Sequence, residues 1–209
     1  MKKLAIAAAL AATMLGAAPA CAAEDGKLQV KLLATGVLPD GKITSVDDPG
    51  GILTAADQTK LNNNLVPTLA VGYYVTPSVS VETICCLTQH HVSGSAGPID
   101  GAEIVDHVMV LPATLTLKYH LDAGGVRPYV GVGPAWFFYI DEKPGALPAL
   151  LGVDKVKLDN KLGVAVQAGI DIPVNANGMG VSLDAKKYWV KTSANYFVAG
   201  AKVLETRHK

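Results

Sequence analysis

The sequence predicts an all-β protein, a transmembrane up-and-down antiparallel β-barrel, and three observations lead to this prediction. The chain begins with a secretory signal, its apolar residues recur at every second position, and its strand connections alternate between tight turns and long segments. Half of the 209 residues are hydrophobic and only 17% are charged, whereas soluble domains carry about 25% charged residues. The chain therefore lacks the charged groups that usually cover a water-facing surface.

The N-terminus has the three parts of a secretory signal. Two lysines precede an apolar run over Leu4–Leu15, and small residues follow as far as Ala23. The run is too short for a membrane-spanning helix, which needs about 20 apolar residues. We expect a signal peptide over 1–23 and an outer-membrane barrel domain over 24–209. Lipidation at Cys21 is the alternative, but Ala18 stands where a lipoprotein signal usually has leucine.

Apolar residues alternate with small or polar ones along most of the mature chain. In the clearest segment, Leu115, Leu117 and Tyr119 are separated by Thr116 and Lys118. Such alternation places the two sets on opposite faces of a strand. On this basis the sequence predicts strands over Lys27–Leu38, Leu65–Val75, Ser78–Val92, Leu111–Leu121, Pro128–Ile140, Lys161–Ile172 and Met179–Thr192.

The composition of the two strand faces favours lipid on the outside of the barrel. One face is a continuous series of Leu, Val and Ile, and the other is mostly Gly, Ala and Thr, which suits the crowded interior of a narrow barrel. A soluble periplasmic barrel, the alternative, would carry Lys and Glu on its polar face. Aromatic residues near the strand ends fit interfacial girdles: Tyr73, Tyr119, Trp136, Phe138 and Trp189.

Short and long connections alternate between the predicted strands. Thr76–Pro77, Asp122–Val126 and Pro173–Gly178 are turns rich in Gly, Pro and Asn. The long connections are Pro39–Asn64, Ser93–Asp106 and Asp141–Asn160, with short helices expected over Thr54–Asn62 and Ala146–Val153. Short turns at one end and long loops at the other are typical of outer-membrane barrels.

One stretch resembles a known family. The strand Leu111–Tyr119, a turn, the run Arg127-Pro128-Tyr129-Val130-Gly131-Val132-Gly133, and then aromatic residues and Asp141 are similar to the OmpW family. The resemblance implies an eight-stranded outer-membrane barrel with a narrow hydrophobic channel. It also implies outer-membrane lipid and small hydrophobic solutes as partners, and uptake of those solutes as the function.

The C-terminus departs from the family pattern. Family members end in a strand that closes with an aromatic residue, whereas this sequence ends at Glu205-Thr206-Arg207-His208-Lys209. We count seven crossings and the start of the eighth, and bacterial barrels use even numbers of strands. We therefore expect that the last strand is missing, and that a chain lacking it does not form a stable closed barrel, because an open edge in lipid leaves backbone groups unpaired.

Charged residues on the inward face are expected in the periplasmic half of the barrel. Charges of opposite sign in a poorly solvated lumen must pair, so we expect an ionic plug; separate solvation at the turns is the alternative. The six residues are Glu82, Lys118, His120, Asp171, Asp184 and Lys186. In the outer half, Ala135, Phe137 and Tyr139 are expected to line an apolar channel.

A plugged lumen would force an apolar solute to leave sideways between strands. Proline weakens a strand pairing because it has no amide hydrogen to donate. Pro67, Pro112 and Pro134 lie in predicted strands, and the last two lie toward the outer half of neighbouring strands. We expect a lateral opening near Pro112 or Pro134, with simple β-bulges as the alternative.

Two other functions compete with transport. A passive structural or adhesive barrel would act through its loops, and a lipid-modifying enzyme would use His90, His91, Ser93 and the pair Asp106-His107. Nothing in their spacing fixes a mutual orientation, so we expect no enzyme.

The sequence also favours neither a metal site nor a nucleic-acid partner. His90-His91 and Cys85-Cys86 are adjacent pairs whose members point to opposite strand faces, so neither pair is expected to bind a metal or to form a disulfide. Basic and acidic residues are equal in number, 18 each, so no basic surface for nucleic acid is expected. Gly131 and Gly133 lie inside a strand and form no phosphate loop, so we expect no cofactor.

Overall fold

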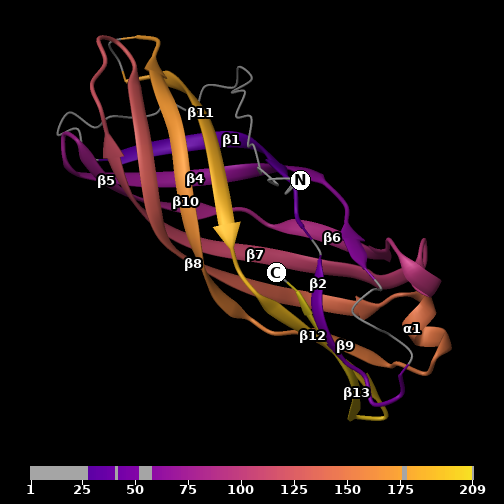
Figure 1. Cartoon of the computed structure of the whole chain (residues 1–209). Helices are drawn as coiled ribbons and strands as arrows, with labels where there is room; N and C mark the ends of the chain where they lie inside the picture. The colour runs from indigo at the N-terminus through magenta and orange to yellow at the C-terminus, as the bar shows by residue number, and fades with distance from the viewer. Residues whose placement is uncertain (1–27, 41, 52–57, 176–177, 209) are drawn as a thin grey trace.

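The computed structural model describes residues 28–40, 42–51, 58–175 and 178–208. Figure 1 shows a long curved wall of strands that continues at one end into a smaller sheet. The expected signal peptide over 1–23 lies outside the described residues. No helix in the described part of the chain is long and apolar enough to cross a membrane.

The wall consists of strands in the order β1-β4-β5-β7-β8-β10-β11. Every neighbouring pair is antiparallel, so the predicted all-β up-and-down arrangement is confirmed. The strands are β1 (Leu28–Val37), β4 (Asn64–Thr76), β5 (Val79–Cys85), β7 (Glu103–His120), β8 (Arg127–Pro144), β10 (Lys161–Pro173) and β11 (Gly180–Trp189).

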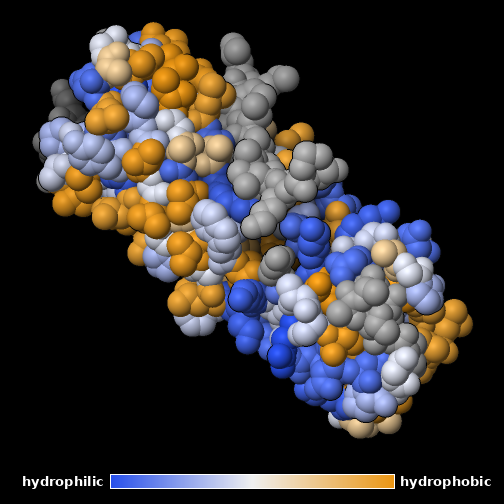
Figure 2. Space-filling view, in the orientation of Figure 1, coloured by the Kyte–Doolittle hydropathy of each residue, from blue (hydrophilic) through white to orange (hydrophobic). Residues whose placement is uncertain are grey.

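The two faces of the wall are as different as the alternation predicts. Leu115, Leu117 and Tyr119 of β7 are 53%, 55% and 52% exposed, whereas Thr116 and Lys118 between them are fully buried. In Figure 2 hydrophobic side chains gather over the barrel, while the end that carries the smaller sheet is largely hydrophilic. Because water-soluble proteins rarely expose large continuous apolar surfaces, this face is the one that contacts hydrocarbon.

The long connections contain more structure than the sequence predicts. A second sheet has the order β2-β13-β12-β9, and two further strands, β3 and β6, pair with each other. The strands are β2 (Ile43–Asp47), β3 (Thr59–Leu61), β6 (Thr88–Gly94), β9 (Lys155–Leu158), β12 (Thr192–Val198) and β13 (Ala201–His208). These strands are short and several carry alternating charges, so their hydrophobic pattern is weak.

An apolar core holds together the end of the barrel that carries the long connections. Val105 and Val108 of β7 pack with Val156 of β9 and Tyr196 of β12 in one buried cluster. For that reason β7 starts at Glu103 rather than Leu111, and β8 runs on to Pro144 rather than ending at Ile140. The outer ends of these two strands pair with each other beyond the predicted wall.

Three expected elements differ in detail. The single strand expected over Ser78–Val92 is interrupted after Cys85, because β5 pairs within the wall with β4 and β7 whereas β6 pairs with β3 and the outer half of β7. The helix expected over Thr54–Asn62 is wrong, because Thr59–Leu61 form the strand β3, which pairs with β6. The first residues of the expected helix, 54–57, lie outside the described ones. The helix expected over Ala146–Val153 is confirmed in shorter form as α1 (Ala146–Leu150).

The last segment of the chain belongs to the second sheet. The stretch expected to begin an eighth strand forms β13, which pairs with β12 and β2. In the described part of the chain, β1 and β11 stand at the two ends of the wall order.

Candidate functional site

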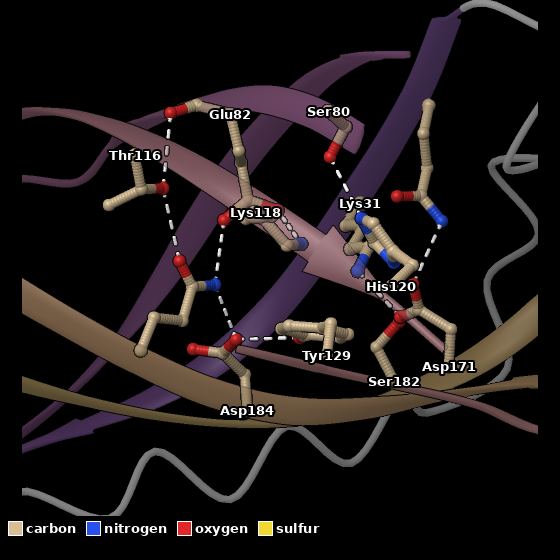
Figure 3. A network of polar contacts seen from close by, with 12 residues as sticks. Lys31, Ser80, Glu82, Thr116, Lys118, His120, Tyr129, Asp171, Ser182 and Asp184 are labelled. Carbon is tan, nitrogen blue, oxygen red and sulfur yellow. Dashed lines mark hydrogen bonds and ion pairs between the residues drawn. The ribbon is translucent and has the colours of Figure 1, made fainter. Parts of the chain in front are cut away.

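A buried polar network fills the half of the barrel interior that is nearer the short turns (Figure 3). All six charged residues expected in the lumen are less than 9% exposed. Two ion pairs are close: Lys118 Nζ lies 2.7 Å from Glu82 Oε2 and Lys31 Nζ lies 2.6 Å from Asp171 Oδ1. Lys186 Nζ lies 3.5 Å from the other oxygen of Glu82. The structure therefore brings charges from five strands of the wall together.

Neutral side chains complete the network. The Gln167 amide donates hydrogen bonds to Glu82 Oε1 at 2.8 Å and to Asp184 Oδ2 at 2.5 Å. Tyr129 donates to the same Asp184 oxygen at 2.6 Å. Sequence reasoning missed Gln167 and Lys31 as members, although Gln167 lies on the face assigned to the interior. Every carboxylate of the network thus has a donor, which a buried charge requires.

His120 closes the network at its periplasmic end. Its Nε2 lies 2.8 Å from Ser80 Oγ, and its ring packs between Tyr74 and Tyr129 with centroid distances of 4.9 and 5.2 Å. His120 Nδ1 has no hydrogen-bond partner among the described residues. The histidine therefore contributes packing and one hydrogen bond rather than an ion pair.

An apolar cavity of about 910 Å³ lies above the polar network in the outer half of the barrel. Asp184 and Lys186 form part of its floor, and aliphatic and aromatic side chains make up most of its walls. Phe137 and Tyr139 line it as expected, and the Phe137 ring meets Tyr188 edge-on at 5.4 Å. Ala135, which was expected to line it, does not, because its small side chain is fully buried.

The two adjacent cysteines lie on opposite faces of the wall, as the alternation predicts. Cys86 is buried and lines the cavity, whereas Cys85 is exposed on the outer face. Both thiols are free.

The adjacent histidines His90 and His91 lie on opposite faces of β6. His90 lines the cavity, with Nδ1 donating to the Asn62 carbonyl at 3.1 Å. His91 points away and lies with Glu103 and Asp106 in an exposed or half-exposed cluster whose ligand atoms are within 4.8 Å of one another. Bulges in the β6–β7 and β7–β8 pairings create this cluster, and no residue pattern predicts these bulges.

His107 joins the outer ends of β7 and β8. Its Nδ1 lies 3.0 Å from Asp106 and its Nε2 lies 3.0 Å from Asp141. With both ring nitrogens facing carboxylates, the charged imidazolium is favoured. Two hydrogen bonds therefore raise the pKa of His107: the one to Asp141 has the larger effect, and the one to Asp106 the smaller.

The raised pKa gives this contact a definite pH dependence. Its stabilisation is fully present below the unfolded pKa of about 6.5 and is lost as the pH rises through the higher folded value. We expect NMR titration to give His107 a pKa above 6.5, and Asp141→Asn to lower it. Asp122→Asn, at a periplasmic turn, is the control and should change nothing. If Asp141→Asn left the pKa of His107 unaltered, Asp141 would not be the cause of the raised value.

The chain is similar to known outer-membrane proteins. A profile of the OmpW family matches residues 24–209. The chain belongs to the OmpW family. It is 30% identical over 203 residues to outer membrane protein W of Escherichia coli (strain K12), covering 96% of this chain and 90% of that protein. It is 31% identical over 170 residues to the uncharacterized outer-membrane protein y4mB of Sinorhizobium fredii, covering 78% of this chain and 66% of the relative's length.

A solved structure has the same fold. The crystal structure of the outer membrane protein OprG from Pseudomonas aeruginosa superposes with a TM-score of 0.73 at 20% identity, covering 86% of each chain. This OmpW family member is therefore an outer-membrane β-barrel, and the expected location in the outer membrane is confirmed.

The run Arg127–Gly133, which carries the family resemblance, adjoins the polar network in this OmpW family member. Tyr129 belongs to the network, and its ring lies 3.7 Å from Lys118 Nζ. Gly131 leaves space for the Lys118 side chain, since a Cβ there would lie 2.9 Å from Lys118 Cγ. A Cβ on Gly133 would lie 1.9 Å from the Leu115 carbonyl oxygen. Both glycines are therefore required by close packing rather than by flexibility.

Proposed function

We propose that this OmpW family protein is a narrow channel for small hydrophobic molecules, which enter from the extracellular side. The observation that carries the proposal is the apolar cavity of about 910 Å³ in the outer half of the barrel. Its size falls within the range of small-molecule sites, about 300–1,000 Å³, and its apolar walls suit a ligand without charge. A passive structural or adhesive barrel has no need of such a space.

The polar network below the cavity acts as a plug in this proposal. An apolar solute that crossed it would have to separate Lys118 from Glu82 and Lys31 from Asp171, all buried. Breaking buried ion pairs without replacing their partners is strongly unfavourable. A direct path to the periplasm is therefore closed to an apolar solute, and the exit is sideways into the membrane.

The contact between β7 and β8 is the proposed exit. Pro112 of β7 lines the cavity, and Pro134 lies on the neighbouring strand. In the β7–β8 ladder, Thr114 pairs with Ala135 and Leu117 pairs with Val132. Between these two pairs, the described residues of β7 and β8 form no further ladder pair. Pro134 has no amide hydrogen to add there. Separating the strands at this point therefore breaks fewer hydrogen bonds than in a regular stretch of ladder without proline.

Catalysis is not part of the proposed function. A serine nucleophile needs a histidine that a third group orients. The contact between Ser80 and His120 is buried within the polar network, and His120 Nδ1 has no partner among the described residues. The contact therefore lacks both the orienting group and access to a substrate.

Occupation of the cavity can be tested with the two cysteines. In the Cys85→Ser variant, we expect octane to slow alkylation of Cys86 by N-ethylmaleimide severalfold, because Cys86 lines the cavity. Glucose should have no effect. The matched control is Cys86→Ser, in which the remaining Cys85 lies on the outer face and should react at the same rate with or without octane. Equal rates for Cys86 with and without octane would contradict the proposal.

A further inference from the structure

Three side chains of metal-binding type meet on the surface at the end of the barrel that carries the long connections. His91 belongs to β6, and Glu103 and Asp106 belong to the first part of β7. Their ligand atoms, one ring nitrogen and two carboxylate oxygens, all lie within 4.8 Å of one another. His91 and Glu103 are exposed and Asp106 is partly exposed, so an ion can reach the cluster from solution.

An irregular strand brings the two carboxylates to the same surface. Glu103 and Asp106 are three positions apart, so they would lie on opposite faces of a regular strand. The two residues between them, Ile104 and Val105, both belong to the buried apolar core. The β6–β7 pairing has two register shifts over residues 90–93 of β6, and a β-bulge of this kind redirects the neighbouring side chains. Both acidic side chains therefore stay outside the core.

Further hydrogen bonds hold each of the three side chains in place. Glu103 Oε2 accepts the Ala146 amide at 3.4 Å, and Asp106 Oδ2 lies 3.0 Å from His107 Nδ1. The second oxygen of each carboxylate, Oε1 or Oδ1, takes no part in these contacts. His91 Nδ1 donates to the Asp106 backbone carbonyl, so the neutral ring carries its lone pair on Nε2. Metal-binding histidines are usually oriented by such a bond from the other ring nitrogen.

The types of ligand atom select a class of ion. An imidazole nitrogen with carboxylate oxygens suits Zn²⁺ and similar transition-metal ions, whereas Ca²⁺ and Mg²⁺ are bound by oxygen. Three protein ligands leave the fourth position of a tetrahedral site to water. Zinc bonds of about 2.0–2.2 Å place two ligand atoms at most about 4.4 Å apart. A small rotation of the exposed Glu103 side chain is enough to reach this spacing.

We infer that His91, Glu103 and Asp106 form a binding site for a divalent transition-metal ion such as Zn²⁺. The site is separate from the apolar cavity, because His90 lines the cavity and the adjacent His91 does not. A bound ion joins β6 to β7 at their bulges. The inference is independent of the proposed function, since it concerns the surface of the protein and not the route of an apolar solute.

The test is a titration of the purified, metal-free full chain in detergent with zinc chloride, followed by calorimetry. His91→Gln removes the nitrogen ligand and keeps a polar side chain on the surface. Because losing even a residue that only orients a ligand weakens metal binding about 10- to 100-fold, we expect His91→Gln to weaken Zn²⁺ binding at least about tenfold. Glu103→Gln should also weaken it, and calcium chloride should bind more weakly than zinc chloride.

His90→Gln is the matched control, because it changes the adjacent histidine, which points into the cavity. It should leave the affinity for Zn²⁺ unchanged. Equal affinities for the unmodified protein and His91→Gln, or equal losses for the two histidine variants, would overturn the inference. Failure of the unmodified protein to bind Zn²⁺ would overturn it as well. Binding of Ca²⁺ as tight as that of Zn²⁺ would overturn the assignment to transition metals.

Discussion

Replacing Lys118 with methionine is expected to destabilise the folded barrel by about 3–5 kcal/mol. Lys118 is fully buried, and its ammonium group is the closest cation to the Glu82 carboxylate, at 2.7 Å. Methionine fills similar space but leaves that carboxylate without its main counter-charge. The loss is measured as the change in the free energy of unfolding by urea in lipid vesicles, followed by the fluorescence of Trp136 and Trp189.

Two further variants separate this effect from a general effect of removing a lysine. Lys202→Met breaks a 2.8 Å pair with Glu205, but Lys202 is 47% exposed, so it should lower the free energy of unfolding far less than Lys118→Met does. Adding Glu82→Gln to Lys118→Met removes the uncompensated charge and should restore part of the stability. Equal losses for Lys118→Met and Lys202→Met would show that the network does not hold the barrel together.

The second large effect is expected on transport. Phe137→Asp places a carboxylate in the apolar cavity wall beside Tyr188, and desolvating that charge or hydrating the cavity opposes passage of an apolar solute. We expect initial uptake of octane by intact cells to fall at least about tenfold, equivalent to about 1.4 kcal/mol.

Controls for this variant isolate the polarity of the cavity. Phe137→Leu keeps an apolar side chain at the same place and should retain most of the uptake. Uptake of small sugars, which enter by other porins, should not change in either variant. Undiminished uptake of octane in Phe137→Asp would reject a route through this region.

The wall of the barrel could be predicted because one rule holds along it. Wherever a strand has lipid on one side and a narrow lumen on the other, the side chains alternate in size and polarity, and this identified all seven strands of the wall. The same rule assigned Glu82 and Lys118 to the interior, where the structure places them in contact.

The second sheet and part of the candidate site could not be predicted, because they depend on strand pairings that no local sequence pattern reveals. β2 and β13 pair although they lie near opposite ends of the chain, and their short alternations are too weak to stand out. Lys31 was missed because the alternation in its strand is weak, and Gln167 because it carries no charge. The cluster of His91, Glu103 and Asp106 arises from bulges that interrupt the regular alternation.

Passage of small apolar molecules through the cavity to the membrane is measured by the same uptake experiment with the unmodified protein. Intact cells that produce the protein are compared with cells that produce none, using labelled octane and a labelled small sugar. We expect faster octane uptake in the cells that contain the protein and equal sugar uptake in both. Equal octane uptake with and without the protein, in cells where the folded barrel is present, would contradict it.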